Sequence, residues 1–228
     1  MGTLIVLEGL DGSGKATQTQ MLCEALAKEG LRVRQISFPD YDSESSALVK
    51  MYLGGAFGVS PADVNPHAAS SFYAVDRFAS YQRDWKQAYL SGTVILADRY
   101  VTSNLIYQLS KVKEDEKEVF IRWVESYEYE KLGLPRPDVT LYLDMDPEIS
   151  QRMLRERYAG DETKKDIHES NIAFLKDCRK NALYSAERLR WHVIPCYEQK
   201  EPKTREAIHR EILKIVRSSI LTPETEDL

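Results

Sequence analysis

The sequence predicts an α/β fold with a five-stranded parallel sheet flanked by helices. Five short apolar runs recur along the chain, each with the length of a buried strand. Segments with helical spacing of apolar residues separate the runs, as in strand–helix–strand units with right-handed crossovers. A glycine-rich turn joins the first run to the first helical segment. At 228 residues the chain has the size of one large domain, and we expect a single domain over 1–228.

The composition narrows the class of protein. Hydrophobic residues make up 43% and charged residues 29%, which is typical of a globular protein. The net charge of −5 gives no electrostatic reason to expect nucleic acid as a partner. No apolar run has the length of a membrane span, and the first strand begins without a charged leader. Cys23, Cys178 and Cys196 show no disulfide or zinc spacing, so we expect a cytoplasmic protein without membrane association.

The first apolar run, residues 4–7, leads into a phosphate-binding motif. Gly9, Gly14 and Lys15 match the P-loop pattern G-x-x-x-x-G-K, which lies between a strand and a helix. Glycines let consecutive N–H groups surround a phosphate, and the helix N-terminus adds its positive dipole. A tight turn without a ligand is the alternative. We predict that a nucleotide's phosphates bind Gly9, Leu10, Asp11, Gly12, Ser13, Gly14, Lys15, Ala16 and Thr17.

The P-loop departs from its usual pattern at one position. Ala16 stands where a serine or threonine normally offers its hydroxyl to Mg²⁺, although Thr17 follows. The protein ligand of the metal is therefore open at this point.

The next elements place polar side chains near the P-loop strand. The helix that begins at Lys15 ends near Gly30, and residues 31–38 alternate as a second strand that Pro39 stops. An amphipathic segment follows through Leu53. Residues 66–90 form a long aromatic-rich helical pattern, in which most rings are expected to be core residues.

Within this helix, Tyr73 and Arg77 are four positions apart. They therefore share one face, and a ring and a planar donor can hold a nucleobase together.

The third strand, residues 93–97, ends in a charged pair. Asp98 and Arg99 follow an apolar parallel strand whose carboxyl end lies near that of the P-loop strand, where ligands bind in such sheets. A structural salt bridge is the alternative to a site role. The opening turns of the next helix add further polar side chains: Ser103, Asn104, Tyr107 and Gln108.

The remaining chain completes the alternation. A charge run over 111–118 precedes a helical pattern over 120–129, and Asp146 is the expected N-cap of the helix that follows the fourth strand. Arg152, Arg155 and Arg157 precede a glycine-containing loop. The arginines and the loop are expected to form a lid over phosphates, roughly 155–166, and a solvated helix face is the alternative. The other expected elements are the fourth strand at 139–143, a helix at 166–189, the fifth strand at 191–195, a terminal helix at 203–220 and an acidic tail at 222–228.

Several of these motifs together resemble the thymidylate kinase family of P-loop nucleoside monophosphate kinases. They are the P-loop over 8–15, Phe38-Pro39, the stretch Tyr73-Ala74-Val75-Asp76-Arg77, and Asp98-Arg99-Tyr100 with the polar positions beyond it. The likeness covers the chain from Leu4 to about Ile220. It implies a nucleoside monophosphate kinase architecture with a lid, and commonly a homodimer packed through helices.

The resemblance implies transfer of the γ-phosphoryl of ATP to dTMP with Mg²⁺, giving ADP and dTDP. Lys15, Asp11 and Arg99 then act at the phosphates, with Asp98 orienting Arg99 or holding the metal through water. Arg155 and Arg157 are the leading lid candidates for the catalytic arginine, with Lys164 or Lys165 behind them. The implied substrate-binding residues are Asp11, Phe38, Tyr41, Tyr73, Arg77, Arg99, Ser103, Asn104, Tyr107 and Gln108.

The chain departs from the family's pattern at three places. Asp40 stands where the family's F-P motif usually continues with arginine, so Tyr41 is expected to contribute instead. The stacking position holds Tyr73 rather than the commoner phenylalanine, with Phe72 beside it. The P-loop has no arginine among its variable positions, which places the catalytic arginine in the lid.

Two other functions stay open from the sequence. The first is a kinase for another deoxynucleoside or nucleoside monophosphate, because the identity of the acceptor depends on few residues. The second is a nucleotide-sensing switch or regulatory ATPase, which would have no use for Tyr73, Arg77 and Asn104 as a set.

Overall fold

A computed structural model describes residues 1–157, 168–169 and 171–221. The predicted tail at 222–228 and most of the predicted lid, including Lys164 and Lys165, lie outside the described residues. Within the described part of the chain, none of the helices has the length and apolar character that a bilayer crossing requires.

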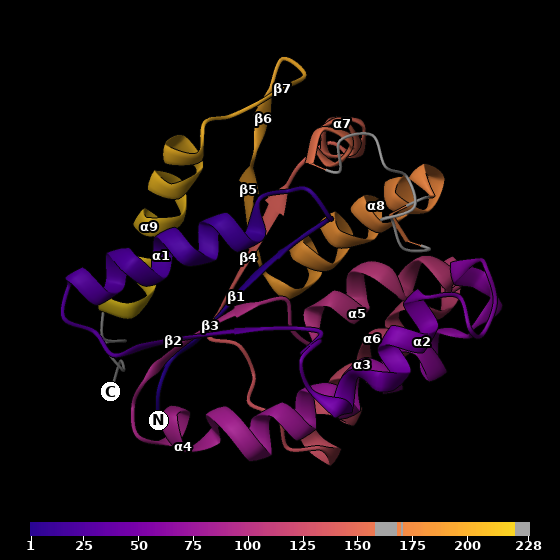
Figure 1. Cartoon of the computed structure of the whole chain (residues 1–228), viewed down its shortest axis with the longest axis horizontal. Helices are drawn as coiled ribbons and strands as arrows, with labels where there is room; N and C mark the ends of the chain where they lie inside the picture. Colours follow the sequence, from indigo (N-terminus) through magenta and orange to yellow (C-terminus); the bar gives the residue numbers. More distant parts are fainter. Residues whose placement is uncertain (158–167, 170, 222–228) are drawn as a thin grey trace.

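The predicted five-stranded parallel sheet is confirmed (Figure 1). The strand order is β2-β3-β1-β4-β5, so the P-loop strand is central. Leu7 on this strand pairs with Asp98 on one side and with Leu141 on the other. The carboxyl ends of three strands therefore meet at one edge, where the predicted site residues begin. The strands are β1 (Leu4–Gly9), β2 (Val33–Ser37), β3 (Val94–Asp98), β4 (Val139–Asp144) and β5 (His192–Pro195).

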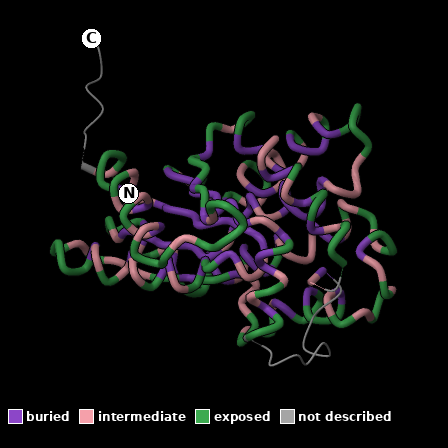
Figure 2. The backbone as a smooth tube through the Cα atoms, turned by 90° about the horizontal axis from the view of Figure 1, so that it is seen from above, coloured by how far each residue is buried: buried purple, intermediate pink, exposed green. Residues whose placement is uncertain are grey.

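Helices cover both faces of the sheet. This arrangement follows from β1, in which residues 4–7 are all apolar and buried. Leu4 and Val6 belong to the core cluster shared with α5 (Thr102–Tyr107) and α8 (Ile172–Leu189). Ile5 and Leu7 belong to the cluster shared with α1 (Lys15–Lys28) and α9 (Arg205–Leu221). Successive side chains of a strand point to opposite faces, so a continuous apolar run predicts this three-layer arrangement. The buried segments accordingly run through the middle of the molecule (Figure 2).

Further helices lie beside the sheet, some of them near its carboxyl edge (Figure 1). The helix expected over 66–90 is α3 (Pro66–Ser80), a π-helical turn η3 (Tyr81–Trp85) and α4 (Lys86–Leu90) in succession. A second π-helical turn, η6 (Ser126–Lys131), ends α6 (Lys117–Glu125). The other elements here are α2 (Ala47–Leu53) and the 3₁₀ turns η1 (Glu44–Ser46), η2 (Pro61–Asp63), η4 (Leu109–Lys111) and η5 (Glu114–Glu116).

The structure corrects two predicted helix starts. The helix expected from 166 begins at Ile172, because the Asn171 side chain accepts the backbone N–H of Phe174 at 3.0 Å and caps it there. The helix expected from 203 begins at Arg205, since an antiparallel ribbon of β6 (Tyr197–Glu198) and β7 (Glu201–Pro202), which the sequence analysis did not predict, precedes it.

The predicted N-cap of α7 (Pro147–Arg157) is confirmed. The Asp146 carboxylate accepts the N–H of Glu148 at 2.8 Å.

Candidate active site

The P-loop follows β1 and turns directly into α1. A Cβ at Gly9 would lie 2.5 Å from Ser13 Oγ and 3.0 Å from the carbonyl oxygen of Leu143. Gly12 has φ +79°, and its Cβ would lie 2.9 Å from the carbonyl oxygen of Ser150. Both positions therefore require glycine, for close approach and for a left-handed backbone.

A cavity of about 480 Å³ opens above the P-loop. The buried Lys15 lines it, and its ammonium donates to the carbonyl of Leu10 at 2.9 Å. Burial lowers the pKa of Lys15, with a further contribution from Arg99. Ala16 and Thr17 also line this cavity, and the buried hydroxyl of Ser13 has no hydrogen-bond partner among the described residues. Six of the nine predicted phosphate-binding residues thus line open space: Asp11, Gly12, Gly14, Lys15, Ala16 and Thr17.

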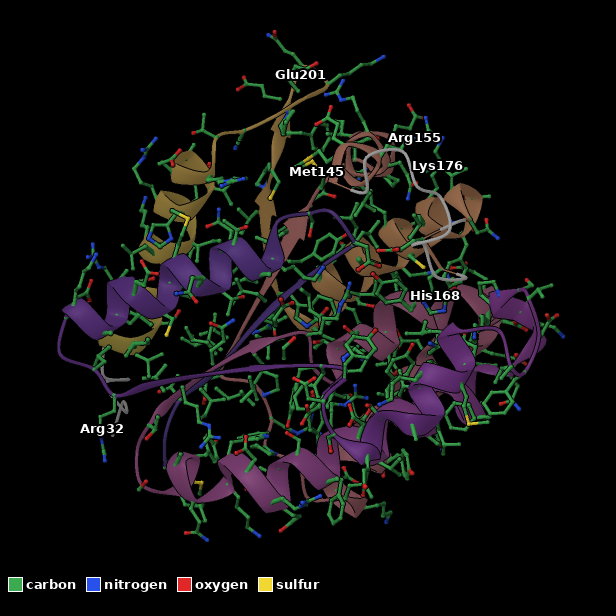
Figure 3. The ribbon with its side chains drawn as sticks, viewed as in Figure 1. Arg32, Met145, Arg155, His168, Lys176 and Glu201 are labelled. Atoms are coloured by element: carbon green, nitrogen blue, oxygen red, sulfur yellow. The ribbon has the colours of Figure 1, made fainter. Side chains whose placement is uncertain are left out.

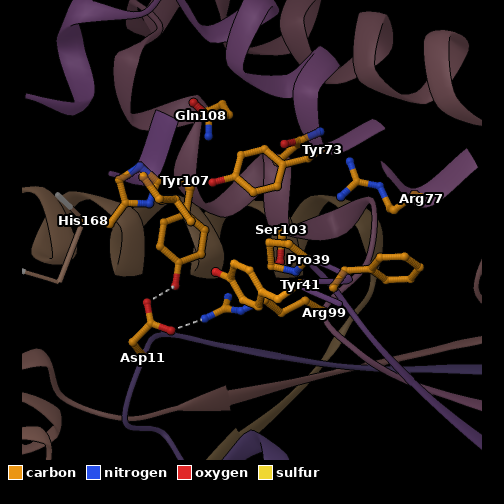
Figure 4. A pocket seen from close by; sticks show the side chains of 13 residues that line it. Asp11, Pro39, Tyr41, Tyr73, Arg77, Arg99, Ser103, Tyr107, Gln108 and His168 are labelled. Atoms are coloured by element: carbon orange, nitrogen blue, oxygen red, sulfur yellow. Dashed lines mark hydrogen bonds and ion pairs between the residues drawn. The ribbon is translucent and has the colours of Figure 1, made fainter. Parts of the chain in front are cut away.

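Arg99 joins this cavity to a second pocket. Its φ of 69°, unusual for a residue with a side chain, turns the guanidinium back over the P-loop. There it donates to the Gly9 carbonyl at 3.2 Å and forms an ion pair with Asp11, which also accepts the Tyr107 hydroxyl at 3.1 Å (Figure 4). Burial opposes ionisation of Asp11, but Arg99 and Lys15 outweigh it and lower the pKa to about 2. Asp11 is therefore anionic at neutral pH.

Glu8 fixes this arrangement from below, and the sequence analysis did not single it out. Its fully buried carboxylate accepts the Tyr100 N–H at 3.1 Å, the Thr102 hydroxyl at 2.6 Å and the Ser103 hydroxyl at 2.8 Å. Burial raises the pKa of Glu8, although Arg99 and these donors oppose the rise. An acidic residue inside an apolar strand was the available signal.

The second pocket brings all predicted substrate-binding residues together (Figure 4). It shares Asp11, Tyr41 and Arg99 with the P-loop cavity, so the two spaces adjoin. Tyr73 lines it, whereas the neighbouring Phe72 packs against Phe57 at 5.6 Å between ring centroids. The lining residues are Asp11, Phe38, Pro39, Tyr41, Leu53, Tyr73, Arg77, Arg99, Ser103, Asn104, Tyr107, Gln108 and His168.

Two polar side chains of this pocket are hydrogen-bonded to a carboxylate outside it, and the side-chain oxygen of a third has no such partner among the described residues. Arg77 donates through Nε and Nη2 to the two oxygens of Glu128, each at 2.6 Å, and Asn104 Nδ2 donates to the same carboxylate at 2.8 Å. By contrast, the buried Oε1 of Gln108 has no hydrogen-bond partner among the described residues. Glu128 was missed because its partner is 51 positions away.

His168 lines the pocket as well, although no motif in the sequence pointed to it. Its ring stacks on Tyr107 with 5.4 Å between centroids, and its Nε2 lies 3.0 Å from the Tyr52 hydroxyl, which accepts from Lys111 at 2.7 Å. Burial, with the nearby Lys111, lowers the pKa of His168 to about 3. The ring is neutral at physiological pH, and its hydrogen bond with the Tyr52 hydroxyl joins it to α2.

Other predicted residues lie elsewhere. Arg155 is exposed on α7 (Figure 3) and is not among the described residues that line either space, while the side chain of Arg157 lies outside what the structure describes. Their catalytic role stays a prediction. Asp40 faces neither space; its N–H donates to Asp76 at 2.9 Å, while the adjacent Tyr41 lines both.

Asp98 is one of three described carboxylates that line the P-loop cavity, with Asp11 and Glu169, and Asp11 is already paired with Arg99. Lys15 lines the same cavity. Among the described residues, no three His, Cys, Asp or Glu side chains gather as a complete metal site. A carboxylate such as Asp98 beside a phosphate cavity fits Mg²⁺, which keeps several waters and takes its other ligands from substrate phosphates.

A P-loop cavity beside a second polar pocket, on a five-stranded parallel sheet of this order, defines a P-loop kinase of the nucleoside monophosphate kinase class. The family model for thymidylate kinase matches residues 7–212. The chain belongs to the thymidylate kinase family.

Individual relatives agree with this assignment. The chain is 31% identical over 160 residues to a thymidylate kinase of Mycobacterium tuberculosis, covering 69% of this chain and 73% of that protein. It is 32% identical to a thymidylate kinase of Caenorhabditis elegans, covering 65% of this chain and 66% of the relative. A solved thymidylate kinase structure from Candida albicans superposes with a TM-score of 0.69 at 23% identity, over 95% of this chain and 92% of that one, which supports the fold.

Proposed function

We propose that this chain transfers the γ-phosphoryl of ATP to the 5′-phosphate of dTMP, giving ADP and dTDP. The observation that carries the proposal is the convergence of every predicted substrate-binding residue on one pocket that adjoins the P-loop cavity. A phosphate oxygen is already a competent nucleophile, so the reaction needs alignment and charge neutralisation more than a general base.

The P-loop cavity is the proposed donor site. The P-loop amides, Ser13 and Lys15 hold the β- and γ-phosphates of ATP. Asp98 holds Mg²⁺ directly or through water, in place of the hydroxyl that Ala16 lacks. Mg²⁺ held there would supply positive charge that offsets the charge of the phosphates.

Arg99 is the proposed link between donor and acceptor. It lines both spaces and has donors beyond those that bind Asp11 and Gly9, so it can also meet the acceptor phosphate. The anionic Asp11 binds both Arg99 and the Tyr107 hydroxyl, and so orients these two groups toward the sugar. Arg155 or Arg157 of the lid supplies charge to the transferring phosphoryl group.

The second pocket is the proposed acceptor site. The Tyr73 ring stacks on thymine, while Arg77 and Asn104 contact the edge of the base. Tyr107 lies against the sugar, where a 2′-hydroxyl fits badly. Phe38, Tyr41, Ser103 and Gln108 complete the enclosure, and the unpaired Oε1 of Gln108 is an acceptor for a ligand donor.

We further propose that the chain forms a homodimer. The outer faces of α2 and α3 carry exposed apolar side chains, and such surface on a soluble chain is a candidate interface.

A panel of acceptors tests the proposed function. Purified protein is supplied with ATP and Mg²⁺ and with dTMP, dUMP, dCMP, dGMP, dAMP or thymidine, and ADP formation is measured. We expect the highest kcat/KM for dTMP. Preference for another monophosphate would favour the alternative kinase, and ATP binding without phosphoryl transfer to any acceptor would favour the nucleotide-sensing switch.

A further inference from the structure

Glu128 lies outside the acceptor pocket but contacts two of the residues that line it. It sits in η6, and both its side chain and that of Arg77 are 1% exposed. Its carboxylate accepts two hydrogen bonds from Arg77 at 2.6 Å and one from Asn104 at 2.8 Å. One buried anion thus holds two neighbouring groups of the pocket at once.

The contacts of Asn104 determine which way its amide faces. The amide nitrogen has an acceptor on each side, the Glu128 carboxylate at 2.8 Å and the Ser70 carbonyl at 3.4 Å. A carboxylate accepts and does not donate, so the NH₂ group must face Glu128. The corner of the amide that remains for the pocket is therefore the acceptor, Oδ1.

Arg77 presents the opposite polarity. Two of its donors bind Glu128, and Nη1 reaches the Tyr100 carbonyl at 3.3 Å. A guanidinium has five N–H donors and no acceptor, so those left over offer only donors to the pocket, toward which Arg77 points (Figure 4). The pocket accordingly offers a donor from Arg77 beside an acceptor from Asn104.

This pattern distinguishes pyrimidines by the substituent at C4. Thymine and uracil have an acceptor at O4 beside a donor at N3, and they complement the pocket. Cytosine has a donor at N4 beside an acceptor at N3, and it opposes both groups.

We propose that Glu128 is a positioning residue that sets the hydrogen-bond polarity of the base pocket, and thereby selects 4-oxo over 4-amino pyrimidine nucleotides. The inference rests on the proposed function, because it assigns a base to this pocket. Glu128 also balances the charge of Arg77, so the uncharged base binds beside an ion pair that has no net charge.

Replacing Glu128 with glutamine tests the proposal. Glu128→Gln keeps the shape but adds an NH₂ group, which can donate to Asn104 Oδ1 and lets the Asn104 amide turn its own NH₂ to the pocket. We expect the ratio of kcat/KM for dTMP to that for dCMP to fall by about tenfold or more, the effect of a lost or reversed buried hydrogen bond. The ratio of dUMP to dCMP should fall equally, because the effect concerns C4 and not the methyl group. The KM for ATP should stay unchanged.

A matched control and a second variant complete the experiment. Glu125→Gln changes a carboxylate three positions earlier, whose ion pair with Arg136 at 2.7 Å lies outside the acceptor pocket, and should leave both ratios at the wild-type values. Glu128→Asp keeps the negative charge that balances Arg77, but its side chain is one methylene shorter. The carboxylate then lies farther from Arg77 and Asn104, so the ratio of kcat/KM for dTMP to that for dCMP should be intermediate.

Equal losses for dTMP and dCMP in soluble Glu128→Gln would indicate only a structural role and overturn the inference. If that variant is insoluble, an unchanged ratio in Glu128→Asp overturns it instead. A wild-type chain without preference for dTMP would refute the proposed function, which is a separate and distinguishable result.

Discussion

The pairing of Arg77 with Glu128 has a consequence for stability as well as for specificity. Removing one member of a buried ion pair leaves an uncompensated charge, which costs about 3–5 kcal/mol. We therefore expect Arg77→Ala to lower the free energy of unfolding by about that amount, measured by urea denaturation.

Arg188→Ala is the matched control for this prediction. Arg188 pairs with Glu118, but its side chain is 54% exposed, so its loss should cost less than about 1 kcal/mol. Equal effects of the two substitutions would contradict the expected role of burial at Arg77.

Lys15 is expected to act on turnover and not on folding. Among the described residues its ammonium donates to the Leu10 carbonyl, and the side chain lines the P-loop cavity. Lys15→Met keeps the aliphatic stem and removes the charge, so we expect kcat to fall by about a thousandfold with an unchanged circular dichroism spectrum.

Lys28→Met, at the exposed end of the same helix, serves as the control and should retain wild-type kcat. Substantial turnover by Lys15→Met would show that the P-loop cavity is not the donor site.

The turn at His168 and Glu169 docks between two elements that come from distant parts of the chain. His168 stacks on Tyr107 of α5 and shares a hydrogen bond with the Tyr52 hydroxyl of α2. Its pKa is lowered to about 3 by burial and by Lys111, so the unfolded chain binds a proton at a higher pH than the folded chain does. The contribution of this group to stability is therefore complete above its ordinary pKa of 6.5 and is lost as the pH falls toward 3.

We expect wild-type protein to lose up to ~1.4 kcal/mol of stability per pH unit below pH ~6.5, relative to His168→Phe, which keeps a ring on Tyr107 but cannot titrate. Urea denaturation at a series of pH values measures this difference. Replacement of the exposed His192 by phenylalanine should leave the wild-type slope intact. Parallel curves for wild type and His168→Phe would contradict the docking of this turn by a neutral imidazole.

Secondary structure could be predicted where local chemistry decides it. The strand at 139–143 is a continuous apolar run, and Asp146 with Pro147 is a local helix start, so both were predicted correctly. The start of α8 was misplaced because Asp166 and Asn171 are both capable caps in sequence. The β6–β7 ribbon was missed because its strands are two residues each and carry no periodic pattern.

At the scale of the whole molecule, site residues could be predicted when they belong to a motif. The residues predicted for the acceptor pocket were found through the P-loop, Phe38-to-Tyr41, Tyr73-to-Arg77 and Asp98-to-Gln108 stretches, whereas Leu53 also lines it and was not predicted. Glu8, Glu128 and His168 were not predicted either, because each acts through partners that only the tertiary fold supplies. A partner 51 or more positions away leaves no local signal for Glu128 or His168, whereas Glu8 stands out as an acidic residue inside an apolar strand.

The outer surface of α2 and α3 supports the last prediction, that of a homodimer. These two helices pack together (Figure 1) and expose Leu48 and Met51 on one, Val75 and Phe78 on the other, with 37% to 45% of each side chain accessible. Burying such a patch against its own copy forms an isologous interface, provided that about 1,000 Å² or more is covered in all.

Light scattering of the wild-type chain at micromolar concentration should give twice 26.2 kDa. The double variant Leu48→Glu and Val75→Glu places like charges face to face across the two-fold axis and should give 26.2 kDa. Leu90→Glu, which charges an equally exposed apolar residue at the far end of α4, should remain dimeric. A monomeric wild-type chain would refute the interface directly. Neither Leu48 nor Val75 lines the P-loop cavity or the acceptor pocket, so dissociation of the dimer should leave both spaces intact.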